Sequence, residues 1–498
     1  MVLLRFVRLI WGIVDAKIEI VKSVRKLLVD EKVLFPESLV NIFNLFEKSG
    51  KEIYLVGAGV RAILSNKVPI NCDLTTNAKP EETLEITKEF EPHYENEFGM
   101  VGVPVGDELY EITTYRSEKG YTDFRRPDEV VWGKTIEEDV VRRDFTMNAV
   151  VMNMDEVIDS VDGVKDFEDG VIRTVGEPEE RFGEDALRMM RAIRFAGTLK
   201  FAIEPKTLAA ISVKAPLLAK ISRERVRDEL FKILASDYPA DGVRLLINTG
   251  LMKYVIPEVL MAKGVDQNGH HVLDVLEHML SSLENCPSRN PVVRLATLLH
   301  DVGKPPTKRL HCRKCGKIVR DDGKSPNIFC DNCKTEQDRR GATTFYGHEV
   351  VGERMASKIA DDLRLSGKDK LKLTTLVRWH MFHYQREMTD AAIRRLIKNI
   401  GKENINDMML LRIGDRKGGG SKTTSWRLME LQKRIGEQLY EPMEINDMVV
   451  NGKDVMEILQ IKPGRKVGEV LKVLFEEVLE DTSKNNREYL VKRIGESQ

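Results

Sequence analysis

The spacing of apolar positions divides the chain into an amino-terminal region of mixed elements and a helical remainder. Residues 36–50 repeat apolar side chains at helical spacing, which predicts a helix. Three short runs rich in β-branched and aromatic residues, at 52–59, 100–105 and 109–116, predict strands. The turn-forming stretch between the last two predicts a hairpin. From about residue 176 nearly every segment outside 309–346 has helical periodicity. The mixed region is therefore an α/β or α+β domain, and we take α+β as the expected fold class of the chain.

The first 14 residues form another apolar run, "MVLLRFVRLIWGIV". Arg5 and Arg8 interrupt it, and no small-residue cleavage site follows, which argues against a signal peptide. The run is also shorter than the ~20 residues that a membrane-spanning helix needs. We interpret residues 1–35 as an amphipathic extension, or as translation from an early start, and expect no membrane association.

Composition narrows the class of protein only a little. A chain of 498 residues has room for about three domains. Its 78 Lys and Arg nearly balance 79 Asp and Glu, so any polyanionic partner must be recognised by local clusters of charge. Four of the six cysteines lie within one short segment, which is typical of a metal site in a reducing cytoplasm and not of a disulfide scaffold.

The stretch "VPINCDLTT" (68–76) has the polar spacing of a metal-binding strand. Asn71 and Asp73 are two residues apart, so on a strand both side chains would leave the same face. Two carboxylates placed in this way hold divalent cations, whereas an amide offers only one neutral oxygen. Glu111, on the predicted strand 109–116, is either a third acid or an outward-facing residue.

A glycine-containing turn precedes this stretch. Gly57, Ala58 and Gly59 separate a predicted strand from a predicted helix, and Arg61 lies one turn into that helix. Backbone N–H groups at such a turn and a nearby guanidinium suit a phosphate group. Alone, a Gly-Ala-Gly turn is weak evidence for a binding site.

Two further segments, 136–150 and 181–197, place paired arginines beside acids. With these motifs the sequence resembles the bacterial tRNA nucleotidyltransferase and poly(A) polymerase family over about residues 36–490. The family turn reads Gly-Gly-x-Val-Arg-Asp, its metal strand Asp-x-Asp, and a further motif Gly-Thr-Val. This chain has Ala58 and Ala62 in the turn, Asn71 in the strand and Met100 in the third motif, and all these departures fall in the phosphate and metal half of the site.

The resemblance assigns roles to individual residues. It implies that Asp73, with whatever Asn71 can contribute, holds Mg²⁺. It also implies that Asp185 and Arg188 pair with the base edges of CTP or ATP, so that protein side chains act as the template. The helical spacing of 184–195 would place Arg188, Arg191 and Arg194 on one rotating ridge. The expected nucleotide-binding residues are Gly57, Ala58, Arg61, Arg143, Asp144, Glu184, Asp185, Arg188, Arg191 and Arg194. For Glu224 and Arg225 we expect a bracing role.

The part of the helical remainder from about residue 270 to 416 contains motifs of a different chemistry. Its segments "HHVLDVLEHML", "LLHDVGKP" and "LRIGDRK" resemble an HD phosphohydrolase domain. The resemblance implies metal ligands at His278, His300, Asp301 and Asp415, with His348 and His380 at the positions where some HD domains add a second metal. Imidazole and carboxylate together suit Mg²⁺ or a divalent transition metal.

Within that region the four clustered cysteines are Cys312, Cys315, Cys330 and Cys333. Two Cys-x2-Cys pairs predict four thiolates on one structural Zn²⁺, as in a zinc ribbon. Two disulfides or free thiols are the alternatives. The insert would flank the HD cleft, and its basic residues are equally suited to contact RNA.

The resemblance therefore implies a tRNA nucleotidyltransferase that builds the 3′-terminal CCA from CTP and ATP with Mg²⁺, and we expect it in the cytoplasm. Two alternatives are an HD phosphohydrolase with a weakened, RNA-binding transferase half, and a non-catalytic tRNA-binding protein. The resemblance implies a polymerase-beta-like palm, a helical nucleobase-binding neck, an HD domain with a zinc-ribbon insert, and a helical tRNA-binding tail. Their expected bounds, after the extension at 1–35, are 36–175, 176–250, 251–425 with the insert at 309–342, and 426–498.

Overall fold

The computed structural model describes residues 35–70, 72–96, 99–119, 129–133, 135–267, 273–320, 327–382, 384–421 and 425–497. Residues 1–34 of the expected extension, and Asn71, lie outside them. The chain divides into two compact units, Met1–Ile233 with Leu245–Val255, and Leu234–Arg244 with Ile256–Gln498. Within the described part of the chain, no helix combines the length and the apolar character that crossing a membrane requires.

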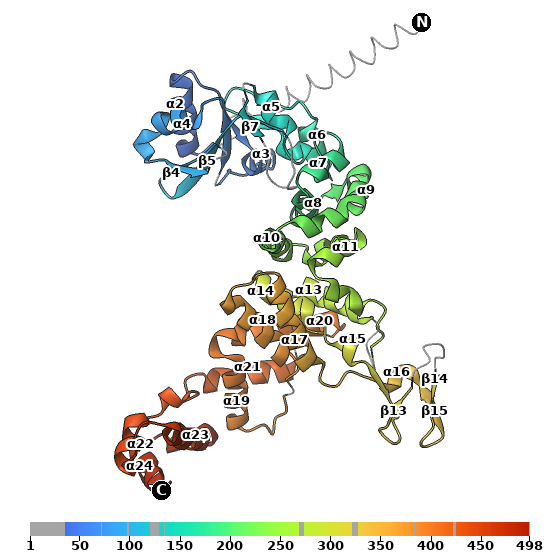
Figure 1. Ribbon diagram of the computed structural model, residues 1–498, viewed down its shortest axis with the longest axis vertical. Helices are drawn as coiled ribbons and strands as arrows, with labels where there is room; N and C mark the ends of the chain where they lie inside the picture. Colours follow the sequence, from blue (N-terminus) through green and yellow to red (C-terminus); the bar gives the residue numbers. More distant parts are fainter. Residues whose placement is uncertain are drawn as a thin grey trace. The chain divides into compact units, whose positions relative to one another are not determined.

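A mixed sheet forms the centre of the first unit (Figure 1). The order of its strands is β3-β4-β5-β2-β1-β8-β9, and β2 and β5 run parallel while the other neighbours are antiparallel. The bounds of the strands are β1 (Ile53–Val56), β2 (Asp73–Thr76), β3 (His93–Asn96), β4 (Met100–Val105), β5 (Glu108–Thr114), β8 (Val151–Met152) and β9 (Val157–Ile158). A separate hairpin is formed by β6 (Arg116–Lys119) and β7 (Glu129–Trp132).

Helices cover both faces of this sheet. On one face α2 (Glu37–Lys48) buries its apolar stripe, including Leu39, Ile42 and Phe46, against the strands. On the other, α5 (Ile136–Val141) contributes to a second apolar cluster. The predicted helix at 36–50 and the predicted hairpin are confirmed, since β4 and β5 are antiparallel with Gly106 and Asp107 between them.

Strand β2 begins at Asp73, and neither residues 68–70 nor Cys72 belong to it. Asn71 lies outside the described residues, so its place on the same face as Asp73 stays a prediction.

The remaining elements of the first unit and the segment that joins the two units are mainly helical. They are α3 (Ala58–Leu64), α4 (Pro80–Ile86), α6 (Gly163–Glu168), β10 (Val171–Ile172), α7 (Pro178–Glu184), α8 (Leu187–Leu199), β11 (Ala202–Ile203), α9 (Pro205–Lys214), α10 (Arg223–Ala235), α11 (Pro239–Asn248) and α12 (Met252–Val255).

In the second unit, α14 (Pro291–Leu299) is surrounded by other helices. Asn290 caps its start by accepting hydrogen bonds from the backbone N–H groups of Val292 and Val293, and Pro291 occupies the first helical position. The neighbouring helices are α13 (Val275–Glu284), α18 (Gly367–Trp379) and α20 (Ile405–Gly418). Further helices of this unit are α15 (Lys304–Thr307), α17 (His348–Asp362), α19 (Asp390–Ile400) and α21 (Trp426–Gln438).

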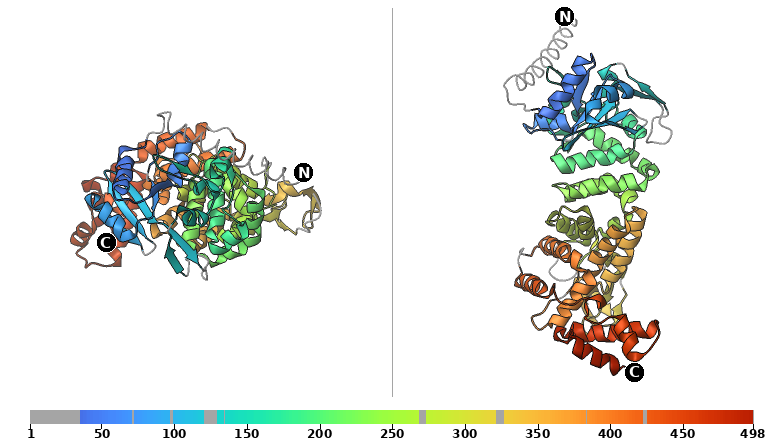
Figure 2. Two further views of the ribbon diagram at one scale, coloured as in Figure 1. Left: turned by 90° about the horizontal axis from the view of Figure 1, so that it is seen from above. Right: turned by 90° about the vertical axis from the view of Figure 1, so that its left-hand side faces the viewer.

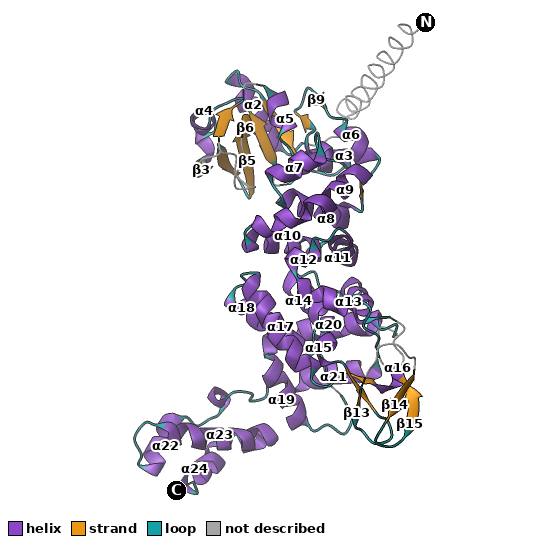
Figure 3. Ribbon diagram, turned by 45° about the vertical axis from the view of Figure 1, so that its right-hand side comes forward, coloured by secondary structure: helices purple, strands orange, loops and turns teal. Residues whose placement is uncertain are grey.

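The cysteine-rich insert and the carboxyl-terminal segment form two smaller bodies within this unit. Figure 3 shows the strands of the insert in orange: β12 (Arg309–His311), β13 (Ile318–Val319), β14 (Asn327–Cys330) and β15 (Thr335–Asp338), followed by α16 (Arg339–Ala342) and β16 (Thr343–Thr344). The tail helices α22 (Gly452–Leu459), α23 (Arg465–Glu480) and α24 (Arg487–Gly495), red in Figure 2, share their own apolar core. The expected α+β class is confirmed.

Candidate functional site

Two acids lie side by side at the edge where β2 begins. Asp73 and Glu111 are register partners on the parallel strands β2 and β5, so their side chains leave the same face of the sheet. The turn after β1 passes close by, because a Cβ added to Gly57 would lie 3.6 Å from Asp73 Oδ2. Gly57 itself has a φ of +60°, which favours glycine. The structure thus brings together two of the three expected acids and the predicted turn, with Ala58 as the first residue of α3.

Three guanidinium groups act on the Asp73 carboxylate. Burial raises the pKa of Asp73, and the charges of Arg143, Arg61 and Arg191 oppose that rise. Arg61 is held by a hydrogen bond from Nη1 to Asn148 Oδ1, and its Cζ lies 5.0 Å from the centre of the Phe195 ring. Burial also lowers the pKa of Arg61 to about 10. This acid beside a set of cations is suited to a metal ion with a phosphate group.

Asp144, which is buried, forms an ion pair with the partly exposed Arg191. Arg191 Nε and Nη2 each lie 2.7 Å from Asp144 Oδ2, while Asp144 Oδ1 accepts hydrogen bonds from Asn148 Nδ2 and the backbone N–H of Phe145, both at 2.9 Å. Burial would raise the pKa of Asp144, but Arg191 and these hydrogen bonds hold it at about 2. In this arrangement Asp144 positions Arg191.

We expect a double-mutant cycle on Asp144→Asn and Arg191→Met to give a coupling free energy of about 2 kcal/mol at pH 7. This is below the ~3–5 kcal/mol cost of breaking a fully buried pair, because the Arg191 side chain is 38% exposed. Since the pKa of Asp144 is lowered in the folded state, the coupling is present above pH ~4 and is lost as the pH falls through about 2. Thermal unfolding at several pH values measures it. The exposed pair of Lys206 and Glu177 is the control, with a coupling near zero.

Arg143, one of the expected nucleotide-binding residues, is held by a buried acid. Its Nη2 donates to Asp139 Oδ2 at 2.7 Å, and Arg142 Nε donates to Asp139 Oδ1 at 2.9 Å. Asp139 is fully buried, and although burial would raise its pKa, Arg143 and Arg142 hold that pKa at about 2. The two arginines of the "RRD" sequence at 142–144 are thus both held by Asp139, while Asp144 is held by Arg191.

The expected continuous helix over 184–195 is wrong at its start. Helix α7 ends at Glu184, Asp185 is extended with φ −135° and ψ 104°, and α8 begins at Leu187. The reason is that Asp185 Oδ1 accepts a hydrogen bond from the backbone N–H of Leu187 at 2.9 Å, which competes with a continuous helix. Asp185 and Arg188 therefore do not share one helix face. Arg225 donates to Asp185 Oδ2 at 2.8 Å, as a bracing residue would.

The arginines of α8 have separate partners. Arg188 Nη1 lies 2.6 Å from Glu184 Oε2, and Arg188 Nη2 donates to the carbonyl oxygen of Arg142 at 2.9 Å. Arg194 Nε lies 2.9 Å from Glu229 Oε2. Only 11% of the Arg188 side chain is exposed, so its orientation is fixed by the protein before any ligand binds.

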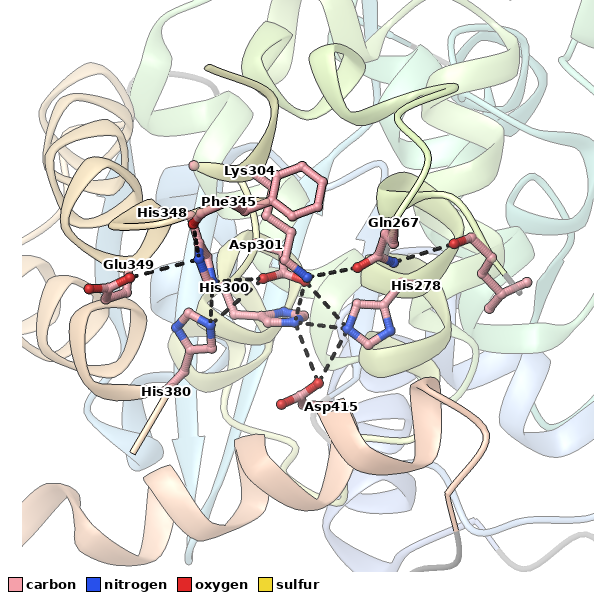
Figure 4. Close-up of polar contacts among 12 residues, drawn as sticks. Gln267, His278, His300, Asp301, Lys304, Phe345, His348, Glu349, His380 and Asp415 are labelled. Atoms are coloured by element: carbon pink, nitrogen blue, oxygen red, sulfur yellow. Dashed lines mark hydrogen bonds and ion pairs between the residues drawn. The ribbon is translucent and has the colours of Figure 1, made fainter. Parts of the chain in front are cut away.

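The second candidate site is a cluster of four histidines around Asp301 in the other unit (Figure 4). His278 Nε2 and His300 Nε2 lie 3.5 and 3.3 Å from Asp301 Oδ2, and His348 Nε2 and His380 Nε2 lie 3.3 and 3.7 Å from Asp301 Oδ1. Asp415 Oδ1 lies 3.2 Å from His278 Nε2. The six residues expected as ligands are thus together. Five of them form two groups that share Asp301, and Asp415 lies beside the group that contains His278 and His300.

Local structure aims these imidazoles inward. His300 and His380 follow the last residues of α14 and α18, and His348 is the first residue of α17. In each of the three, Nδ1 donates to the carbonyl oxygen three residues earlier, at 2.7, 2.7 and 2.9 Å. This fixes Nε2 as the nitrogen that faces the centre, as in metal-binding histidines. Nitrogen and carboxylate donors of this number fit one or two divalent ions.

Lys304 belongs to the same cluster, although the resemblance assigned it no role. Its Nζ lies 2.6 Å from Asp301 Oδ2 and donates to Gln267 Oε1 at 2.7 Å. Burial would raise the pKa of Asp301, but His300 and Lys304 hold it well below its usual range. The signal was present in the sequence, because Lys304 follows Asp301 by three residues in "HDVGK". Arg412 Nη1 lies 2.6 Å from Asp415 Oδ2, and the sequence motifs had not indicated this residue as part of the site either.

The four cysteines of the insert form one cluster. Cys312 Sγ lies 3.3 Å from Cys333 Sγ, Cys315 Sγ lies 3.6 Å from Cys330 Sγ, and all four sulfur atoms lie within 4.8 Å of one another. Tetrahedral Zn–S bonds of ~2.3 Å would place the sulfur atoms ~3.8 Å apart. The donor set therefore fits Zn²⁺. Hydrogen bonds from the backbone, chiefly that of Cys315, lower the pKa of Cys312 to about 6, which favours the thiolate.

We expect purified protein, prepared without chelator, to contain about one zinc per chain. Changing Cys330 to Ser should release the metal and lower the melting temperature of the insert. Elemental analysis measures the metal. Cys286→Ser is the matched control, because Cys286 is also buried but lies outside the cluster, and it should keep its zinc. A zinc-free wild-type protein would rule out the ribbon.

Comparison with known proteins relates these sites to families. The Poly A polymerase head domain model matches residues 53–173, and the model of the probable RNA and SrmB-binding site of polymerase A matches 200–262. The HD domain model matches 269–416, and a tRNA nucleotidyltransferase domain 2 model matches 353–494. The resemblance to the tRNA nucleotidyltransferase and poly(A) polymerase family, with an HD domain, is confirmed.

Curated relatives match less than half of the chain. The CCA-adding enzyme of Levilactobacillus brevis is 45% identical over 214 residues, which are 43% of this chain and 54% of that protein. The CCA-adding enzyme of Enterococcus faecalis is 47% identical over 206 residues, 41% of this chain and 50% of that protein. The chain thus spans about half the length of the curated relatives it matches.

Solved structures extend the likeness of the fold. The Bacillus stearothermophilus CCA-adding enzyme in complex with CTP is 24% identical, covers 92% of this chain and 96% of its own, and has a TM-score of 0.66. The Thermotoga maritima CCA-adding enzyme complexed with tRNA is 19% identical, covers 95% and 98%, and has a TM-score of 0.54. At these identities the matches establish the fold.

Proposed function

We propose that this chain, in which a Poly A polymerase head domain is joined to an HD domain, is a CCA-adding tRNA nucleotidyltransferase that builds or repairs the tRNA 3′ end from CTP and ATP. The observation that carries the proposal is the pairing of Asp73 with Glu111 in register, facing the guanidinium groups of Arg61, Arg143 and Arg191. The CCA-adding relatives and the CTP, ATP and tRNA complexes of proteins with this fold support it. Its place of action would be the cytoplasm.

In this reaction the 3′-hydroxyl oxygen of tRNA bonds to the α-phosphorus of the nucleotide, and pyrophosphate leaves. Asp73 and Glu111, with the amide of Asn71, would hold Mg²⁺. When bound, this ion lowers the barrier by neutralising charge on the phosphate oxygens. Arg61 and Arg191 would bind the triphosphate, and Asn148, Phe195 and Asp144 keep these two arginines oriented.

Base selection would rest on Asp185 and Arg188. A carboxylate accepts from the exocyclic amine that cytosine and adenine share, and a guanidinium donates to their ring nitrogens or carbonyl oxygen. Glu184 and the carbonyl oxygen of Arg142 hold Arg188, and Arg225 holds Asp185. Asp185 lies in the break after α7, and Arg188 lies in α8. The position of the carboxylate relative to the guanidinium, and so the base that the two can bind, therefore depends on that break.

We expect Arg188→Ala to lower kcat/KM for CTP and ATP together by about tenfold to a hundredfold, since a good bidentate contact to a base is worth ~1–3 kcal/mol. Incorporation of labelled CMP and AMP into tRNA measures it, with circular dichroism to check folding. Lys206→Ala, in an exposed ion pair on α9, is the control and should keep full activity. Unchanged use of both nucleotides by Arg188→Ala would contradict the template role.

The histidine cluster favours a second activity, metal-dependent hydrolysis of a phosphate ester. Four imidazoles in two groups that share Asp301, with Asp415 beside one of them, are suited to Mg²⁺, Mn²⁺ or another divalent transition metal. A metal bound there would lower the pKa of a water molecule toward neutrality. Asp301 would belong to both metal groups, and Lys304 would be displaced from it toward the phosphate.

A further inference from the structure

The three-stranded sheet of the cysteine-rich insert has a face with no role in either proposed activity. The strand order is β13-β12-β16, and the register pairs Leu310 with Val319 and with Thr343. Leu310 and Val319 pack in an apolar cluster, and Thr343 is buried, so these three residues mark the inner face. Because side chains alternate along a strand, their neighbours point to the other face. We call this outer surface the ribbon face; it consists of Arg309, His311, Ile318, Arg320 and Thr344, with Tyr346 against His311.

The ribbon face combines exposed apolar and aromatic side chains with cations. Ile318 is 66% exposed and Tyr346 is 79% exposed. Arg309 and Arg320 are exposed as well, and these two arginines are the charged residues of the face. Surfaces that bind single-stranded nucleic acid have this composition, because aromatic rings stack on unpaired bases while cations attract the phosphates.

Contacts within the insert orient the side chains of this face. The rings of His311 and Tyr346 meet edge to face, with 5.7 Å between their centres. His311 is itself held by a hydrogen bond between Nδ1 and Thr344 Oγ1 at 2.7 Å. Arg309 Nη1 donates to the carbonyl oxygen of Lys308 at 2.8 Å. Because these contacts restrict the side chains in the free protein, less conformational entropy is lost when a ligand binds.

The other exposed aromatic residue of the insert lies in a different electrostatic environment. Phe329, on the hairpin of β14 and β15, is 51% exposed. Its register partner is Glu336, and Asp338 is the partner of Asn327, so two acids share its side of the hairpin. Lys334 Nζ lies 6.0 Å from the centre of the Phe329 ring, but the acids outnumber this one cation. The ribbon face, and not this hairpin, is therefore complementary to a polyanion.

We propose that the ribbon face binds an unpaired segment of RNA, with Arg309 and Arg320 on its phosphates and Tyr346 stacked on a base. Such contacts do not depend on the base sequence, because every nucleotide has a phosphate and a ring face. Double-stranded RNA fits poorly, since its bases already stack on one another. The insert thus adds an RNA contact outside the transferase site. That this RNA is tRNA rests on the proposed function.

The first test measures stacking. Binding of a short labelled oligouridine to the full-length protein is followed by fluorescence anisotropy, without CTP, ATP or Mg²⁺. Tyr346→Ala should weaken binding by about fivefold or more, whereas Tyr346→Phe should keep most of the affinity. Phe329→Ala is the matched control, because it removes an exposed ring from the acidic hairpin of the same insert, and it should bind like the wild type. A duplex of the same length should bind Tyr346→Ala and the wild type equally.

The second test measures the phosphate contacts. The logarithm of the binding constant falls with the logarithm of the salt concentration by about 0.7 per phosphate contact of a single strand, so Arg309→Gln with Arg320→Gln should reduce this slope by about 1.4. Lys317→Gln with Lys334→Gln is the control, because it removes the same charge outside the ribbon face, where Lys317 Nζ donates to Asn332 Oδ1. It should keep the wild-type slope.

Either test can overturn the proposal. A wild-type protein that does not bind oligouridine would contradict it, and so would wild-type affinity in Tyr346→Ala or a wild-type salt slope in the double arginine variant. Circular dichroism and zinc content check that each variant is folded. Binding of oligouridine requires no nucleotide transfer, so a protein that fails to add CCA would leave both tests of the ribbon face valid.

Discussion

Replacing Asp73 by asparagine is expected to lower the rate of CMP and AMP addition to tRNA by about a thousandfold or more. Asp73 is the acid closest to the glycine turn, and the charges of Arg143, Arg61 and Arg191 act on its carboxylate. Since position 71 already carries a neutral amide, the substitution leaves Glu111 as the one carboxylate of the three expected metal-binding side chains. Single-turnover incorporation at saturating Mg²⁺ measures the loss.

Asp107→Asn is the matched control for this substitution. Asp107 is an exposed acid in the turn between β4 and β5 of the same sheet, and its replacement should leave incorporation unchanged. A variant at Asp73 that retains a tenth or more of the wild-type rate would show that the metal is held by other residues.

Replacing Asp301 by asparagine is expected to abolish metal binding at the histidine cluster and any phosphohydrolase activity, while nucleotide addition to tRNA stays within about twofold of wild type. The reason is that Asp301 belongs to both groups of candidate ligands, so one substitution removes a charge from each. The substitution also leaves the buried ammonium of Lys304 without its anionic partner. Its positive charge then repels any metal ion that binds nearby. Calorimetric titration with Mn²⁺ measures the binding.

Asp361→Asn is the control for the second substitution. Asp361 lies in α17, and its side chain is 65% exposed in an ion pair with Lys370. Its replacement should leave Mn²⁺ binding intact. Undiminished stoichiometry in Asp301→Asn would contradict a shared carboxylate, and thermal unfolding of the same sample would separate loss of metal from loss of folding.

Local patterns were sufficient for much of the fold. The helix at 36–50, the hairpin of β4 and β5, and the helical character after residue 176 follow from apolar spacing and turn residues, and these features depend on near neighbours. The break at Asp185 was missed because a side chain competes there with the backbone for one hydrogen bond, which periodicity does not detect.

In the two sites, too, motifs within short segments were predictable, whereas contacts between distant residues were not. The six expected HD ligands and the four cysteines were named from motifs and do lie together. In contrast, the pairing of Asp144 with Arg191 and of Arg225 with Asp185 joins residues 47 and 40 positions apart, and only the tertiary structure reveals such contacts. Position 71 lies outside the described residues, so its contribution is a question for kinetics.

The most direct test of the proposed activity is incubation of the wild-type protein with tRNA that ends at the discriminator base, labelled CTP and ATP, and Mg²⁺, followed by sequencing of the product ends. We expect two C residues and then one A, formed slowly, and a faster reaction at lower Mg²⁺ in Asn71→Asp, which restores a second anionic ligand. A wild-type protein that adds no nucleotide over hours at high Mg²⁺ would contradict the assignment.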